Sequence, residues 1–105
     1  MSNMITYEQR KEVYLDAIRT YGPDNQVIMA IEELSELTQM LCKTLRFEGA
    51  DPEALIDELA DATIMLEQVR IMADVNKQVC ERMDYKIARL AKRVREAQED
   101  AAYED

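Results

Sequence analysis

The chain lacks histidine and tryptophan, and its 105 residues include only two glycines, two prolines, two cysteines and one phenylalanine. Without histidine, it has neither the Glu-x-x-His pairs of di-iron helical bundles nor the usual nitrogen ligands of zinc. So few glycines and prolines provide little turn chemistry for a protein of many short strands. The composition therefore favours an all-α protein, in which any hard metal site would be built from oxygen ligands.

Basic residues are also scarce, because 13 lysines and arginines stand against 22 acids and give a net charge of −9. A chain this acidic is unsuited to a broad surface for duplex nucleic acid. It contains no run of about twenty apolar residues to span a membrane, and the first residues, MSNMITYEQRKEV, contain no apolar segment typical of a secretory signal. Cys42 and Cys80 stand apart from each other, so we expect buried, reduced thiols in a cytoplasmic protein.

Helical periodicity fills the chain in four stretches that are separated by short breaks. The expected helices cover residues 7–21, 24–47, 52–73 and 76–98. Thr6 is suited to cap the first helix and Gly22 to end it, while Asp51 and Pro52 suit the cap and first turn of the third. The acidic tail, about residues 99–105, is expected to fray. We therefore predict a single all-α domain over residues 1–105, built as a four-helix bundle.

Apolar residues recur along one face of each expected helix and predict the core. The stripe of the second helix is Val27, Ala30, Leu34, Leu37, Leu41 and Leu45, and that of the third is Leu55, Leu59, Ala62, Leu66 and Val69. The third helix is also apolar on its opposite side, at Ala60, Ile64 and Ile71. A helix that is apolar nearly all round is usually buried on several sides. We therefore expect self-association to enclose the third helix, with scattered surface isoleucines as the alternative.

Two pairs of acids lie beside these stripes without basic neighbours. Glu33 and Glu36 are spaced i, i+3 on the second helix, and Glu58 and Asp61 repeat that spacing on the third. Residues 20–42 and residues 47–69 contain no lysine or arginine. Like charges at this spacing destabilise a helix by about 0.2–0.5 kcal/mol per pair. Four solvated acids are one interpretation; two matched pairs without counter-ions favour a cation bound from outside.

The chemistry of the donors limits which cation fits. Four carboxylates form a hard, all-oxygen ligand set, which suits Mg²⁺, with Mn²⁺ as the alternative. Zinc is disfavoured because the chain has no histidine and no paired cysteines. We therefore predict that Glu33, Glu36, Glu58 and Asp61 bind Mg²⁺.

The fourth expected helix has the opposite charge character. Seven of the 13 basic residues lie between positions 77 and 95, and Arg82, Lys86, Arg89 and Arg93 follow one face. A solvated basic face is the simpler interpretation. An acidic metal cluster combined with a cationic strip is, however, the arrangement that a polyphosphate requires. Arg82, Lys86 and Arg89, with Lys43 of the second helix, are the candidate phosphate-binding residues, and no glycine-rich phosphate loop is present.

The acids and their surroundings resemble a known family. Glu33-Leu-Ser-Glu36 and Glu58-Leu-Ala-Asp61, within AIEELSELTQMLCK and DELADATIMLEQV, are similar to the ExxE and ExxD motifs of the all-α nucleoside triphosphate pyrophosphohydrolases, the MazG-like superfamily. The two longer strings resemble the short, single-domain members found in phages and prophages. The resemblance extends over residues 6–95.

This resemblance implies a fold, an activity and a ligand set. The fold would be a four-helix bundle completed by oligomerisation, as a homodimer or homotetramer. The activity would be Mg²⁺-dependent cleavage of nucleoside or deoxynucleoside triphosphates between the α and β phosphates. Our mechanistic hypothesis adds that Glu33 or Glu36 also acts as general base. Basic residues of the following helix would contact the phosphates. The sequence departs from the family here, because Arg82 and Lys86 replace a lysine followed by an asparagine, which leaves the preferred base open.

Two other functions remain open from the sequence. One is a non-catalytic helical oligomer that binds a partner helix through methionine-rich grooves, since the chain has seven methionines. The other is a specialised member of the same superfamily, such as a phosphoribosyl-ATP pyrophosphohydrolase. Binding of Mg²⁺ would separate the adaptor from an enzyme, and a substrate panel would identify the specialised member.

Overall fold

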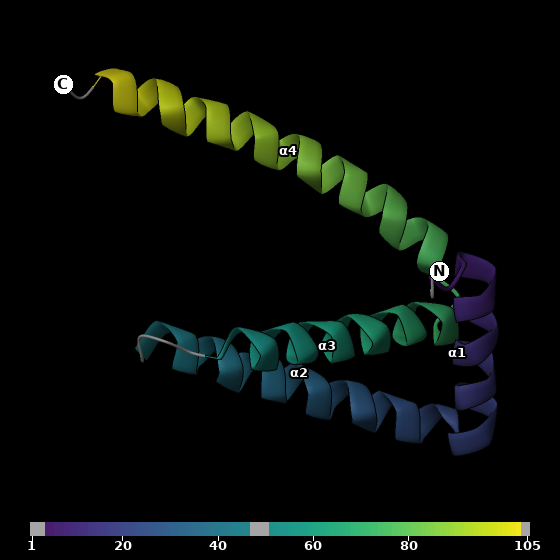
Figure 1. Ribbon diagram of the computed structural model, residues 1–105. Helices are drawn as coiled ribbons and strands as arrows, with labels where there is room; N and C mark the ends of the chain where they lie inside the picture. The colour runs from purple at the N-terminus through teal and green to yellow at the C-terminus, as the bar shows by residue number, and fades with distance from the viewer. Residues whose placement is uncertain (1–3, 47–50, 104–105) are drawn as a thin grey trace. The chain divides into compact units, whose positions relative to one another are not determined.

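The computed structural model describes residues 4–46 and 51–103, and all the regular structure in these ranges is helical. The helices are α1 (Tyr7–Tyr21), α2 (Pro23–Arg46), α3 (Pro52–Met72) and α4 (Asn76–Tyr103) (Figure 1). The predicted all-α class and the four expected helices are confirmed. Among the described residues, no helix is both long and apolar enough to cross a membrane.

Hydrogen bonds at the ends of α1 explain its boundaries. The Thr6 hydroxyl accepts the backbone N–H of Gln9 at 3.1 Å, and the Gln9 side-chain oxygen accepts the N–H of Thr6 at 2.9 Å. This capping box satisfies two donors that the first turn leaves free. At the other end, Gly22 adopts a φ of 92° and donates its N–H to Ile18 O at 2.9 Å. Glycine adopts that φ without steric cost.

The next boundaries follow the expected chemistry with two differences. Asp51 caps α3 by accepting the N–H of Glu53 at 3.0 Å, and Pro52 occupies the first turn. α2 begins at Pro23 rather than at Asp24, because proline needs no N–H partner in a first turn. α4 continues to Tyr103, so the part of the tail expected to fray is helical through this residue. Phe47, expected as the last residue of the second helix, lies outside the described residues.

The chain divides into two compact units, Met1–Asp74 and Val75–Asp105. In the first unit, α2 and α3 run side by side in opposite directions, and α1 crosses them where α2 begins and α3 ends (Figure 1). Its buried side chains are Tyr14, Gln26, Ala30, Ala62, Met65 and Gln68. In the second unit, α4 follows Val75 and carries Arg82, Lys86, Arg89 and Arg93 along one face.

The face of α2 that packs against α3 differs from the predicted core stripe. The residues turned toward α3 follow heptad-like spacing and are buried or half-buried: Gln26, Ala30, Glu33, Leu37 and Met40. Most of the predicted stripe lies about one position further round the helix and stays exposed. Val27 is 42 % exposed, Leu34 37 %, Leu41 47 % and Leu45 90 %. Of the six stripe residues, only Ala30 is buried and Leu37 half-buried within one chain.

The same rotation appears on α3. Ala62, Met65 and Gln68 are buried, whereas Leu59 and Leu66 of the predicted stripe remain 45 % and 43 % exposed. In an antiparallel helix pair, positions displaced equally from the contact line lie on the same side of the pair. The exposed leucines of α2 and α3 therefore share one apolar face. The expectation of buried thiols was also wrong, because both Cys42 and Cys80 are exposed.

Candidate metal centre

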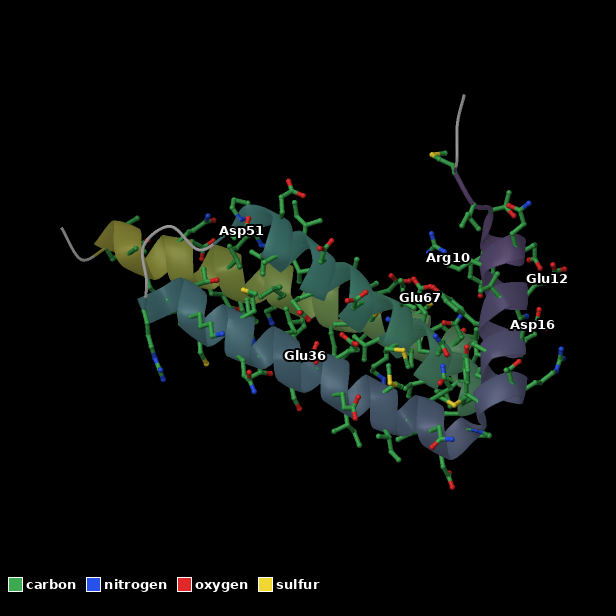
Figure 2. All side chains as sticks on the ribbon, turned by 60° about the horizontal axis from the view of Figure 1, so that its bottom comes forward. Arg10, Glu12, Asp16, Glu36, Asp51 and Glu67 are labelled. Carbon is green, nitrogen blue, oxygen red and sulfur yellow. The ribbon has the colours of Figure 1, made fainter. Side chains whose placement is uncertain are left out.

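Three carboxylates converge where α2 faces α3. Glu33 and Glu36 come from α2 and Glu58 from α3, and one oxygen of each lies within 4.8 Å of the others. Figure 2 labels Glu36 on α2 beside α3. The i, i+3 spacing places Glu33 and Glu36 on neighbouring positions of one helix, and the antiparallel packing brings Glu58 to them. Tertiary structure thus joins acids that are more than twenty positions apart in sequence.

Asp61, the fourth predicted ligand, lies near this group. It is exposed and is not one of the three residues whose oxygens converge within 4.8 Å. Its negative charge nevertheless acts on both Glu33 and Glu58. We call Glu33, Glu36, Glu58 and Asp61 the acid cluster. The structure therefore brings the four predicted acids into one region, three of them at close range.

Two oxygens of the acid cluster are buried without a partner. Oε2 of Glu33 and Oε2 of Glu58 accept no hydrogen bond from any described residue. Removing a carboxylate oxygen from water without a compensating donor is unfavourable. The ion pairs seen in the described part of the chain join Arg10 to Glu67, Arg19 to Asp16 and Lys92 to Glu96, so none of these neutralises the cluster.

The electrostatics of the cluster follow from this geometry. Loss of hydration raises the pKa of Glu33 above its ordinary value, and the negative charges of Glu36 and Asp61 raise it further. Loss of hydration also raises the pKa of Glu58, and the negative charges of Glu36 and Asp61 and a hydrogen bond with Glu36 raise it further. A bound cation would reverse both effects by supplying the missing positive charge. The donor set, all oxygen and partly without hydrogen-bond partners, fits Mg²⁺ or Mn²⁺.

The predicted phosphate-binding residues belong to both units. Lys43 is exposed on α2, seven residues beyond Glu36, and therefore lies on nearly the same side of the helix about 10 Å along its axis. Arg82, Lys86 and Arg89 are exposed on α4 in the second unit. Their spacing places them along one face of that helix. Their contact with a phosphate remains a prediction.

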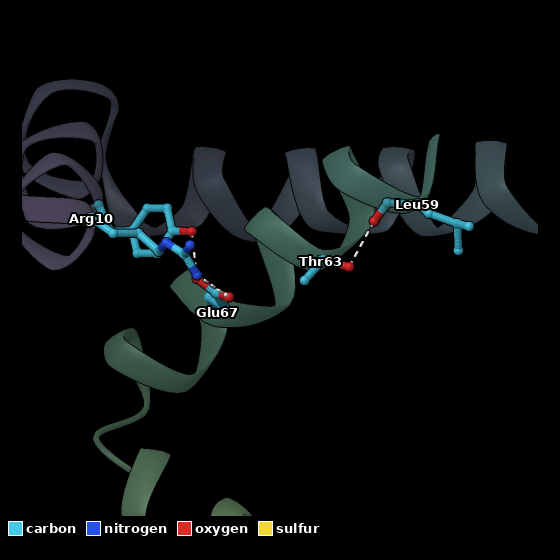
Figure 3. Close-up of polar contacts among 5 residues, drawn as sticks. Arg10, Leu59, Thr63 and Glu67 are labelled. Carbon is cyan, nitrogen blue, oxygen red and sulfur yellow. Dashed lines mark hydrogen bonds and ion pairs between the residues drawn. The ribbon is translucent and has the colours of Figure 1, made fainter. Parts of the chain in front are cut away.

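A polar network that was not predicted from the sequence links α1 to α3. Arg10 Nη1 lies 3.2 Å from Glu67 Oε1, and the hydroxyl of the buried Tyr14 donates to Glu67 Oε2 (Figure 3). This network borders a groove of about 900 Å³ that Val13, Ala17, Leu59 and Ile64 also line. The partners lie more than fifty positions apart, so no local spacing could have identified them.

A second unexpected contact lies inside the α2–α3 interface. Gln26 Nε2 donates to Gln68 Oε1 at 2.7 Å, and both side chains are buried. Gln68 Nε2 in turn approaches the sulfur of Met65 at 3.7 Å. The sequence offered one indication of this contact: Gln26 precedes Ala30 and Glu33 at helical spacing, so it lies on the same face of the helix.

Comparison of the chain with protein-family models, with curated proteins and with solved structures finds no match.

Proposed function

We propose that this protein hydrolyses nucleoside or deoxynucleoside triphosphates between the α and β phosphates, in a reaction that depends on Mg²⁺. The observation that carries the proposal is the convergence of Glu33, Glu36 and Glu58 with two buried oxygens that have no hydrogen-bond donor. The motif resemblance described above points to the same chemistry. Both arguments rest on the same acids.

In the proposed reaction, Glu33, Glu36, Glu58 and Asp61 would hold the metal. Bound Mg²⁺ would neutralise phosphate charge and lower the pKa of a coordinated water. Oxygen from water forms a bond to the α phosphorus, while the bond from that phosphorus to the α–β bridging oxygen breaks and pyrophosphate leaves. The carboxylate of Glu33 or Glu36 accepts the proton of the attacking water.

The basic residues would neutralise the remaining charge of the substrate. Lys43 extends from the same helix as Glu36, and Arg82, Lys86 and Arg89 provide guanidinium and ammonium donors on α4. Guanidinium groups match phosphate oxygens in pairs, whereas an ammonium acts as a compact charge. Replacing Arg82 by alanine should therefore raise KM for the triphosphate more than it lowers the affinity for Mg²⁺ alone.

The decisive experiment is an activity panel over the eight common NTPs and dNTPs with Mg²⁺, plus phosphoribosyl-ATP, with nucleotide products and pyrophosphate both identified. Monophosphate and pyrophosphate in equal amounts are the expected products. Orthophosphate with a nucleoside diphosphate, or no turnover of any substrate, would reject the proposal. Glu36→Gln should abolish turnover, and Glu32→Gln, at an exposed glutamate of the same helix outside the acid cluster, is the matched control.

We also propose that the protein self-associates, as a dimer or tetramer, through the apolar face shared by α2 and α3. The support is the exposure of Val27, Leu34 and Leu41 on α2 together with Leu59 and Leu66 on α3. A second copy that carries the same face would bury it by isologous packing. Light scattering should give a multiple of the chain mass, and Leu34→Glu should reduce it. A monomeric wild-type protein at high concentration would reject this proposal.

The non-catalytic adaptor remains the competing function. An adaptor has no reason to bind Mg²⁺ more than weakly, because its apolar surfaces would recognise a partner helix. Calorimetric titration of the wild-type protein with Mg²⁺ therefore separates the two. No measurable heat at millimolar Mg²⁺, in a protein that also turns over no nucleotide, would favour the adaptor.

A further inference from the structure

The hydrogen bond between Gln26 and Gln68 is a buried polar side-chain link across the α2–α3 interface. The exposed fractions are 6 % for Gln26 and 4 % for Gln68, so neither amide can exchange its partner for bulk water. A displaced buried amide would face apolar groups and lose its hydrogen bond. The pair therefore discriminates between alternative alignments of the two helices.

The apolar contacts of the same interface distinguish less strongly than this hydrogen bond between alternative alignments of α2 and α3. Ala30 and Ala62 are small, and Leu37 and Met65 are flexible, unbranched or singly branched side chains. Flexible side chains such as Leu37 and Met65 can change rotamer to fit a shifted partner. In helical pairs of this type, a single buried polar contact can select one register from several apolar alternatives.

The register also determines which acids meet. In antiparallel helices, paired positions have a constant sum, and Gln26 with Gln68 gives the same sum as Glu33 with Asp61 and Glu36 with Glu58. A shift of one turn would move α3 by about 5 Å relative to α2. Oxygens that now lie within 4.8 Å of one another would then separate.

From these observations we infer that Gln26 and Gln68 are positioning residues, whose hydrogen bond sets the α2–α3 register and thereby assembles the acid cluster. The effect on the register stands on the geometry alone. The effect on metal binding rests on the proposed function. The two can fail separately, and the experiment below measures each.

Spin labels report the register directly. Cys42 and Cys80 are replaced by serine, and labels are attached at Asp24→Cys and Glu53→Cys, two exposed first-turn positions on α2 and α3. Pulsed electron–electron distances are measured for the otherwise wild-type protein, Gln26→Leu, Gln68→Leu and the double leucine variant. Gln39→Leu, an exposed glutamine on α2, is the matched control.

We expect one narrow distance distribution for the wild type and for Gln39→Leu. The double leucine variant should retain its helical circular dichroism and its Tm, yet show a second population displaced by about 5 Å. Each single variant should melt earlier, because it leaves one buried amide without its partner. A residue needed only for packing would change Tm without splitting the distance distribution.

A second readout follows the acids themselves. Calorimetric titration with Mg²⁺ should give a weaker affinity for the double leucine variant than for the wild type and Gln39→Leu. An unchanged single distance in the double variant overturns the inference, and so does loss of its helical structure. Wild-type protein that binds no Mg²⁺ overturns the proposed function instead, and leaves the register result intact.

Discussion

Tyr14 of α1 donates its hydroxyl to Glu67 of α3, and Arg10 contacts the other oxygen of the same carboxylate at 3.2 Å. One carboxylate thus serves a phenol and a guanidinium from the same helix. This shared acceptor ties α1 to the end of α3, where few apolar side chains are buried. It lies apart from the acid cluster in sequence and involves different residues.

The first prediction concerns the ionisation of Tyr14. Burial, the hydrogen bond to Glu67 and the charge of that carboxylate raise the pKa of Tyr14 to about 12, while Arg10 lowers it slightly. Absorbance at alkaline pH should therefore show one of the five tyrosines titrating near 12, and Tyr14→Phe should remove this component. Tyr21→Phe, on an exposed position, is the control and should leave it in place. If no tyrosine titrates near 12, the hydrogen bond does not form in solution.

Stability should respond to the same ionisation. Because the pKa of Tyr14 is raised in the folded state, its contribution to the free energy of unfolding is complete below about pH 10 and declines as pH rises toward 12. At neutral pH, Tyr14→Phe should lower this free energy by about 2 kcal/mol through loss of a hydrogen bond to a charged acceptor. Urea unfolding at several pH values measures both effects.

The second prediction concerns the acid cluster without metal. The pKa values of Glu33 and Glu58 are raised above 4.5 in the folded protein, so the folded state binds more protons than the unfolded chain just above that pH. This contribution favours folding at low pH and is lost as pH rises through the raised values. In EDTA, the Tm of Glu36→Gln should decrease less with rising pH than the Tm of the wild type. Equal slopes in the two proteins would contradict the electrostatic account.

The third prediction concerns added Mg²⁺ at neutral pH. A ligand present at one hundred times its Kd stabilises the folded state by about 2.7 kcal/mol, provided that the unfolded chain does not bind it. We expect Mg²⁺ to raise the Tm of the wild type and of the control Glu32→Gln. Glu58→Gln should respond much less, because it removes the contribution of α3 to the three converging acids. Equal shifts in all three proteins would indicate a general salt effect.

The fourth prediction concerns the start of α1. Thr6 and Gln9 exchange two hydrogen bonds in a capping box. Thr6→Ala removes the side-chain acceptor and should lower the free energy of unfolding by about 1 kcal/mol, whereas Thr6→Ser should retain most of it. Denaturant titration measures the difference. If Thr6→Ala has the same free energy of unfolding as the wild type, the first turn of α1 contributes nothing to the stability of the fold.

Much of the secondary structure could be predicted because its causes are local. Thr6, Gly22 and Asp51 act on backbone groups within a few residues, and the structure confirms all three caps. The end of α4 was placed too early, because the acidic residues after Gln98 were given more weight than their helical propensity. Single residues at helix ends have weak effects, so boundaries of this kind are the least certain.

The candidate site was predictable only in part. The absence of basic neighbours identified Glu33, Glu36, Glu58 and Asp61 as unusual, and their charges do act on one another in the folded chain. Which oxygens converge, and which remain without donors, depends on how α2 lies against α3. A helical wheel identifies an apolar side but does not state which part of that side another helix covers. For this reason the leucine stripes were assigned to the core, although several of these leucines are exposed.

The sequence alone determined the helices and their caps, together with a ligand set limited to oxygen, because each depends on residue type and short spacing. Only the tertiary structure decided the α2–α3 register, the burial of the Gln26–Gln68 pair and the attachment of Tyr14 to Glu67. These features arise from contacts between residues more than forty positions apart. Their free energies depend on the distance and hydration of both partners, which neither partner specifies by itself.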